Sequence, residues 1–158
     1  FSPSPNGHFS GAASQIDSIK LLDVGTDVTN LGPVKCELAS RFAAWTEYAV
    51  KRAARQHLGS ELARIETMGS YSCRNIAGTS KRSQHAHANA IDVSAFVLMD
   101  GRRITVENNW KSGRKEKQFL AAIHSSACKR FGTVLSPDYN AAHYNHFHFD
   151  MSGNGYCR

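Results

Sequence analysis

The sequence predicts a single α+β domain. A chain of 158 residues, 41% of them hydrophobic, can bury one sizeable core but is too short for two ordinary domains. Two amphipathic helices, one β-hairpin and one alternating strand near the C-terminus indicate the fold class. Residues 1–15 are rich in Ser, Pro and Gly, so we expect a flexible N-terminal arm there and a folded domain over 16–158.

Two main helices are expected. The first begins after Pro33 and ends at Gly59, and its apolar face is formed by Leu38, Phe42, Trp45 and Ala49 at spacings of three and four. The second is expected over 115–130, with an inner face formed by Phe119, Leu120, Ile123 and Ala127. Both helices therefore present one apolar side to the core.

Three further segments have the sequence pattern of β-strands rather than of helices. Residues 62–68 alternate in the manner of a strand. Residues 91–99 and 102–106 are two β-prone runs joined by Asp100-Gly101, which is typical of a hairpin because the turn needs positive φ at its centre.

A last strand is expected over 146–151. Successive side chains of a strand point to opposite faces, so Phe147 and Phe149 would face the core. The other face would then carry His146, His148 and Asp150. This alternation places two imidazoles side by side on the open face of the sheet.

The net charge and the distribution of apolar residues indicate which classes of partner the protein could bind. The formal net charge of +6 favours attraction to an anionic surface such as nucleic acid, acidic lipid or bacterial cell wall. The basic residues are dispersed and no recognition-helix pattern accompanies them, so we expect no nucleic-acid binding. No apolar run approaches the roughly 20 residues that span a bilayer, so no membrane span is expected.

Four cysteines are present, and their even number suits two disulfides. The preferred pairing is Cys36 with Cys73 and Cys128 with Cys157, because the second pair brackets the C-terminal histidines. Disulfides imply an oxidising compartment outside the cytosol. The alternative is four buried free thiols in a cytosolic protein.

Two separated histidine clusters carry the candidate chemistry. The first pairs His85 with Asp92 across six intervening residues, and the second contains His143, His146 and His148. Together they can supply the three protein ligands of an open zinc site. Such a site leaves a coordination position for water, which is a requirement for hydrolysis.

The remaining residues suggest a division of roles. One histidine of the last strand can bind the metal, while the other acts as general base or stabilises the developing oxyanion. Arg74 can hold a substrate carboxylate or polarise a carbonyl.

The first cluster resembles a known motif. The segment Ser83-x-His85-x-x-Ala88-x-Ala90-x-Asp92 is similar to the S-x-H-x-x-G-x-A-x-D motif of the LAS metallopeptidases, with Ala88 where the motif has Gly. More closely, the chain from about residue 31 to its end resembles the bacterial extensin-like C-terminal family. The segments that carry this second resemblance are 69–75, 83–92, 100–104 and 131–158.

The resemblance implies an α+β fold in which a small antiparallel sheet, flanked by two main helices, carries a zinc site. The implied metal ligands are His85, Asp92 and His148, with His146 as the catalytic histidine. In the competing assignment His146 is the ligand and His143, at the position of a glutamate in several relatives, is catalytic. Strand alternation favours the first assignment.

The activity implied is that of a zinc-dependent peptidoglycan hydrolase that cleaves an amide bond in cell-wall peptides, as an endopeptidase or carboxypeptidase. The expected protein is a monomer in the periplasm or secreted from a bacterium, with Zn²⁺ as cofactor and peptidoglycan peptides as partners. Alternatives are a peptidoglycan amidase, a secreted antibacterial effector with the same site, and a non-catalytic wall-binding module that zinc stabilises.

Overall fold

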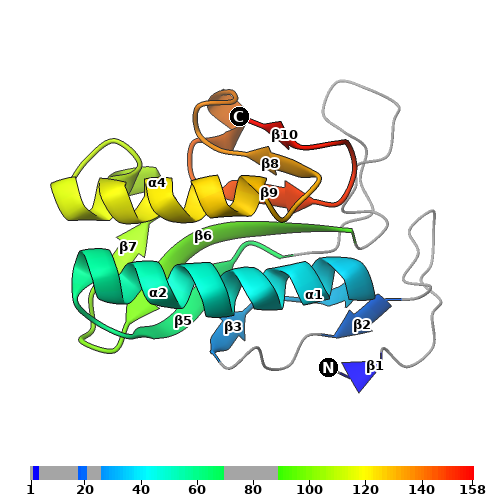
Figure 1. Cartoon of the computed structure of the whole chain (residues 1–158), viewed down its shortest axis with the longest axis horizontal. Helices are drawn as coiled ribbons and strands as arrows, with labels where there is room; N and C mark the ends of the chain where they lie inside the picture. The colour runs from blue at the N-terminus through cyan, green and yellow to red at the C-terminus, as the bar shows by residue number, and fades with distance from the viewer. Residues whose placement is uncertain (1, 4–17, 21–25, 70–88) are drawn as a thin grey trace.

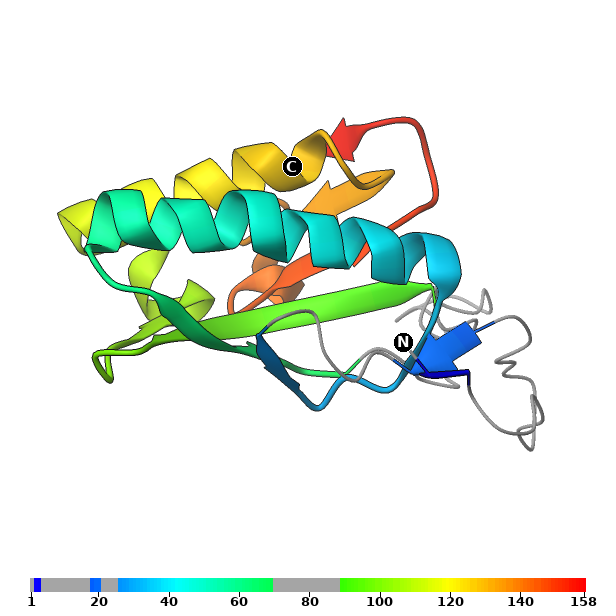
Figure 2. The same cartoon turned by 60° about the horizontal axis from the view of Figure 1, so that its bottom comes forward.

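The computed structural model describes residues 2–3, 18–20, 26–69 and 89–158 of the chain (Figure 1). These residues form one small α+β domain, which confirms the expected fold class. Seen from a second direction, both long helices lie on one face of the sheet (Figure 2). The core lies between the helices and this face.

The first predicted helix is confirmed as one continuous helical segment. It consists of α1 (Cys36–Trp45) and α2 (Lys51–Ala53), joined and followed by the π-helical turns Thr46–Val50 and Ala54–Leu58. Gly59 ends it in the left-handed conformation, at φ 65°, and donates its N–H to Arg55 O at 3.2 Å. Glycine adopts this conformation without strain, which explains why the helix ends there.

The second predicted helix is α4 (Arg114–Cys128), and its predicted inner face is buried. A short helix that the sequence did not predict, α3 (Val106–Asn109), precedes it. The Thr105 hydroxyl accepts the backbone N–H of Asn108 at 3.0 Å and so caps the N-terminus of α3.

The main sheet has seven strands among the described residues, in the order β10-β8-β9-β6-β5-β3, with β7 paired to β6 beside the end of β9. The expected antiparallel pairs form its centre, but β3–β5 and β8–β10 are parallel, so the sheet is mixed. The strands are β3 (Asp27–Thr29), β5 (Leu62–Thr67), β6 (Ala90–Leu98), β7 (Arg103–Thr105), β8 (Thr133–Leu135), β9 (Phe147–Asp150) and β10 (Tyr156–Cys157).

The predicted hairpin is β6–β7, and Gly101 in its turn has the expected positive φ, 94°. A second, antiparallel sheet contains β1 (Ser2–Pro3), β2 (Ser18–Lys20) and β4 (Pro33–Lys35). The start of the chain thus pairs with β2. Residues 4–15 of the predicted flexible arm lie outside the described residues.

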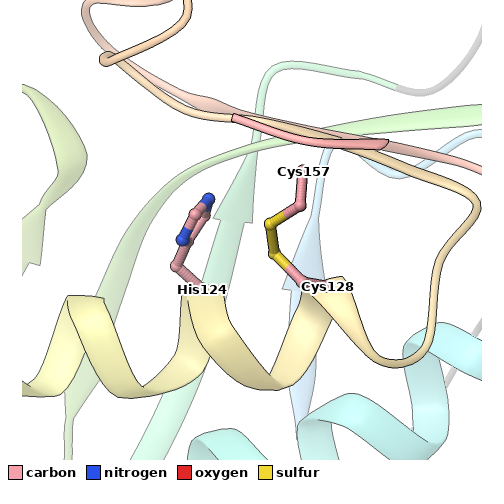
Figure 3. A group of neighbouring side chains, drawn as sticks. All are labelled: His124, Cys128 and Cys157. Atoms are coloured by element: carbon pink, nitrogen blue, oxygen red, sulfur yellow. A yellow bond between two sulfur atoms is a disulfide. The ribbon is translucent and has the colours of Figure 1, made fainter. Parts of the chain in front are cut away.

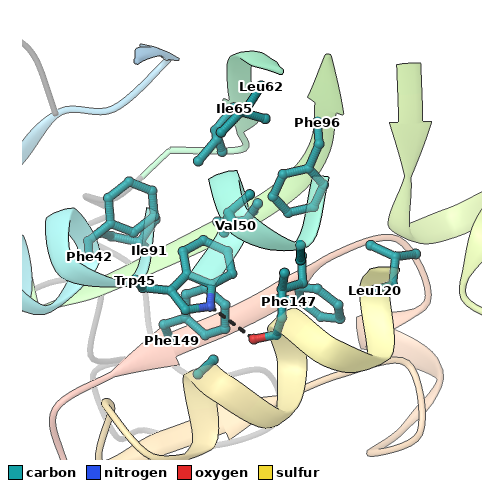
Figure 4. Close-up of a cluster of buried hydrophobic side chains, with 14 of the residues drawn as sticks. Phe42, Trp45, Val50, Leu62, Ile65, Ile91, Phe96, Leu120, Phe147 and Phe149 are labelled. Carbon is teal, nitrogen blue, oxygen red and sulfur yellow. Dashed lines mark hydrogen bonds between the residues drawn. The ribbon is translucent and has the colours of Figure 1, made fainter. Parts of the chain in front are cut away.

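Aromatic side chains join the helices to the sheet in the core (Figure 4). The Trp45 ring lies 4.8 Å from that of Phe149, centroid to centroid, and Phe149 stacks on Phe131 at 4.6 Å. The indole N–H of Trp45 donates to Ile123 O of α4 at 2.9 Å. Trp45 therefore contacts both the second helix and the strand that carries His148.

The disulfide between Cys128 and Cys157 is present, as predicted, and ties the end of α4 to β10. Cys36 is exposed, while Cys73, its predicted partner, lies outside the described residues. Within the described segments, no helix has the length and apolar character to cross a membrane.

Candidate functional site

Strand pairing brings two of the predicted ligands together. β6 and β9 are antiparallel neighbours, and Asp92 lies directly opposite His148 in their register. Phe147 and Phe149 are fully buried in the core, so His148 lies on the other face of the sheet, as the alternation predicted.

His148 lies between two carboxylates. Its Nδ1 is 3.1 Å from Asp92 Oδ1, and its Nε2 is 2.5 Å from Asp150 Oδ2. The second oxygen of Asp150 accepts the backbone N–H and the hydroxyl of Ser152, at 2.8 and 2.5 Å. Asp150 is thus fixed by its neighbours and in turn fixes the imidazole ring.

His146 faces the other oxygen of the same aspartate. Its Nε2 is 3.8 Å from Asp92 Oδ2, and its Nδ1 is 2.8 Å from Asn145 Oδ1. An amide oxygen can only accept, so Nδ1 donates this hydrogen bond and Nε2 is the nitrogen that faces the site.

His143 completes the cluster from the 3₁₀ turn Ala141–His143. Its ring lies 4.9 Å from that of His146 and 6.2 Å from that of His148, centroid to centroid. Its Nδ1 is 2.7 Å from Asn140 Oδ1. The structure therefore brings Asp92 and all three C-terminal histidines together.

The environment moves the pKa values of two histidines in opposite directions. Burial opposes protonation of His148, but hydrogen bonds to Asp150 and Asp92 outweigh it and raise the pKa of His148 to about 9. Burial lowers the pKa of His143 to about 4, and the nearby imidazoles of His146 and His148 act in the same direction. His143 is therefore neutral at pH 7.

The raised pKa of His148 predicts a pH dependence of stability in the metal-free protein. Between pH 6.5 and about 9, His148 keeps its proton in the folded state but loses it in the unfolded chain. The stabilisation of the folded state by protonated His148 is therefore complete below pH 6.5 and is lost as the pH rises through about 9. This shift corresponds to roughly 3 kcal/mol of unfolding free energy. Urea unfolding of wild type and His148→Gln, in the presence of a chelator and at a series of pH values, measures this contribution. If the unfolding free energy changed with pH equally in the two proteins above pH 6.5, the raised pKa of His148 would be contradicted.

Two of the predicted donor atoms stand at a separation compatible with a shared metal ion. Two ligands of one tetrahedral zinc, each about 2.0–2.2 Å from it, stand roughly 3.4 Å apart. The separation of Asp92 Oδ1 from His148 Nδ1, 3.1 Å, is close to this value. His85, the predicted third ligand, lies outside the described residues, as does Arg74. Their predicted roles remain predictions.

A second group of metal-binding residue types lies on α4 and β10 (Figure 3). Among the described residues, His124, Cys128 and Cys157 are the one group of three whose ligand atoms lie within 4.8 Å of one another. The two sulfurs are joined in the disulfide, so neither is available as a thiolate ligand. His124 packs against Trp110 and Phe147, and burial lowers its pKa, so its surroundings are those of a packed core residue.

The sequence did not assign roles to the residues that hold the histidine rings. Alternation placed Asp150 on the same face as His148, and this was a usable signal for their contact. Asn145 and Asn140 orient His146 and His143, but nothing in the sequence pattern distinguishes them from other loop asparagines.

The fold and the site together define an α+β domain with a cluster of histidines and carboxylates on the face of its sheet opposite the two long helices. The family described as Extensin-like protein C-terminus matches residues 2–158, and the chain belongs to it. No curated protein and no solved structure matches the chain.

Proposed function

We propose that the protein is a zinc-dependent peptidoglycan hydrolase of the LAS type, which cleaves an amide bond in cell-wall peptides. The observation that carries the proposal is the chain of contacts from Asp92 through His148 to Asp150. Histidines that bind metal almost always donate their other ring N–H to a carboxylate, a backbone carbonyl or water. His148 has this arrangement, with Nε2 on Asp150 and Nδ1 toward Asp92.

The assignment of residues follows from these contacts. Asp92, His148 and the predicted ligand His85 would hold the metal. When bound, zinc supplies a water whose pKa is close to 7 and which is therefore nucleophilic at neutral pH. His148 must lose its Nδ1 proton as the metal enters, so zinc affinity should rise with pH.

His146 is the residue proposed to move the proton. Asn145 holds its Nδ1–H, which leaves the Nε2 lone pair on the side of Asp92, within reach of a group bound there. His143 is neutral at pH 7 and stands beside both other imidazoles. In the competing assignment His146 is the ligand and His143 is catalytic; the Asp150 carboxylate on the other ring nitrogen of His148 favours His148 as the ligand.

Substrate class and compartment rest on other features. The net charge of +6 favours attraction to the anionic bacterial wall, and the Cys128–Cys157 disulfide favours an oxidising compartment. We therefore place the protein in the periplasm or outside a bacterial cell, acting as a monomer on peptidoglycan peptides.

The test is mass spectrometry of purified peptidoglycan after incubation with the zinc-loaded protein. We expect new fragments that have gained one water at an amide bond, and their disappearance when a chelator removes the metal. The fragment masses distinguish an endopeptidase, a carboxypeptidase and an amidase. Zinc binding without any fragment would refute the hydrolase and favour the non-catalytic wall-binding module.

Removing the outer carboxylate should weaken metal binding without removing a ligand. For Asp150→Asn we expect zinc affinity to fall by about 10–100-fold, because the amide holds the His148 ring less firmly and makes it a weaker base. Competition with a chromophoric chelator measures this. Asp138→Asn, an exposed change in the same C-terminal region, is the matched control and should bind zinc like wild type. An unchanged affinity in Asp150→Asn would remove the main support for the site.

A further inference from the structure

A polar groove of about 280 Å³ lies beside the candidate metal centre. It is formed where the β6–β7 hairpin, α3 and the loop before β9 meet. Its polar lining consists of Ser94, Arg103, Thr105, Glu107, Asn108 and Asn145.

The groove and the candidate centre share structural elements. Asn145 lines the groove with its side chain and also holds His146 through its Oδ1. Met68, which lines the groove as well, donates its backbone N–H to Asp92 O at 2.9 Å. Ser94 is two residues beyond Asp92 on β6. A ligand that lies in the groove therefore reaches the edge of the histidine cluster.

Among the described residues that line the groove, Arg103 is the one basic residue. Its Nε and one terminal nitrogen donate to Glu66 Oε1 at 3.1 and 2.7 Å, while Arg64 donates to the other oxygen of Glu66 at 3.1 Å. Two arginines thus share one carboxylate, which leaves one positive charge uncompensated within this trio. The Arg103 side chain is 53% exposed and already fixed in place, so it is preorganised for an anionic ligand.

Two neutral residues of the groove, Thr105 and Asn145, offer hydrogen-bond donors, whereas the Ser94 hydroxyl already donates to Glu66 O at 3.2 Å. Thr105 accepts from the backbone N–H of Asn108, so its own hydroxyl proton is left for another acceptor. Asn145 uses its oxygen on His146, which leaves its NH₂ group as a donor. Glu107 adds one acceptor, suited to an amide N–H. This lining matches a peptide end that is rich in carbonyl and carboxylate oxygens.

We infer that the groove is a substrate subsite that binds the free carboxylate end of a cell-wall peptide, with Arg103 as the residue that binds the carboxylate. The identity of the peptide rests on the proposed function; the preference for a carboxylate rests on the groove itself. Bound in this way, the peptide lies alongside Asn145 and next to His146.

The experiment is calorimetric titration of the zinc-loaded protein with diacetyl-L-Lys-D-Ala-D-Ala, whose only charge is its terminal carboxylate, and with the same peptide as its carboxamide. We expect the wild type to bind the acid at least about tenfold more tightly than the amide, as for a charge-assisted hydrogen bond. Arg103→Gln should lose this preference, and Arg103→Lys should recover part of it.

Arg41→Gln is the matched control, because it removes the same charge from an exposed position of α1 and does not line the groove. It should bind the acid within about twofold of wild type. Equal binding of acid and amide by wild type, or an unchanged preference in Arg103→Gln, would overturn the inference.

The binding assay does not depend on turnover, so the two proposals fail separately. Carboxylate-dependent binding without release of wall fragments would refute the proposed hydrolase activity but support the subsite. The opposite result would be that wild type shows no preference for the carboxylate and that Arg103→Gln releases as many fragments as wild type. This would refute the subsite but support the hydrolase.

Discussion

Replacing Asp92 with Asn should abolish both zinc binding and the release of fragments from peptidoglycan. Asp92 is the buried carboxylate that faces two imidazoles, at 3.1 Å from His148 and 3.8 Å from His146. The amide keeps the shape of the side chain but removes the anionic oxygen that a metal ligand requires. The loss in zinc affinity should exceed the roughly 10–100-fold expected for an outer partner.

Zinc titration by chelator competition and mass spectrometry of the digest measure the two effects of Asp92→Asn. Asp27→Asn, the same change at an exposed position of β3, is the control and should behave like wild type. An Asp92→Asn protein that is folded, binds zinc at wild-type affinity and releases fragments would show that the metal site is elsewhere.

The largest effect on stability is expected for Trp45→Ala. The ring is fully buried, contacts Phe149 at 4.8 Å and donates a hydrogen bond to Ile123 O. Truncation leaves a large cavity between the helices and β9 and removes the hydrogen bond to Ile123 O, so we expect a loss of about 3–5 kcal/mol in the unfolding free energy. Because Phe149 adjoins His148, loosening of the core should also lower zinc affinity.

Urea unfolding at constant pH in the presence of chelator measures the effect of Trp45→Ala. Tyr48→Ala is the control on the same helical segment, since Tyr48 is 63% exposed and its truncation should change stability by no more than about 0.5 kcal/mol. A loss below about 1 kcal/mol for Trp45→Ala would contradict its central place in the core.

The long periodic elements could be predicted from the sequence, and the short strands could not. The helical segment that ends at Gly59 and the β6–β7 hairpin each show a local pattern with its own stop or turn residue. β8 and β10 have three and two residues, too few to show any period, and they form only because they pair with other segments of the chain, β8 with β9 and β10 with β8. Their pairing is a tertiary effect, supported by the disulfide at Cys157.

In the candidate site, too, one part could be predicted from the sequence and another could not. Strand alternation and the spacing from the first cluster predicted that His148 and Asp92 would come together, and they do. The orientation of each ring could not be predicted, because it depends on side-chain rotamers of Asp150 and Asn145 in the folded state. The groove around Arg103 could not be predicted from the sequence either, since it forms only where separate elements meet in the folded state.

The central claim is that Asp92 and His148 hold the metal on which hydrolysis depends, while His146 moves the proton. The most direct test is to measure zinc content and fragment release together in His148→Ala and His146→Ala. We predict that His148→Ala loses both, and that His146→Ala keeps stoichiometric zinc but releases no fragments. A His148→Ala protein that retains zinc, or a His146→Ala protein that loses it, would contradict this division of roles.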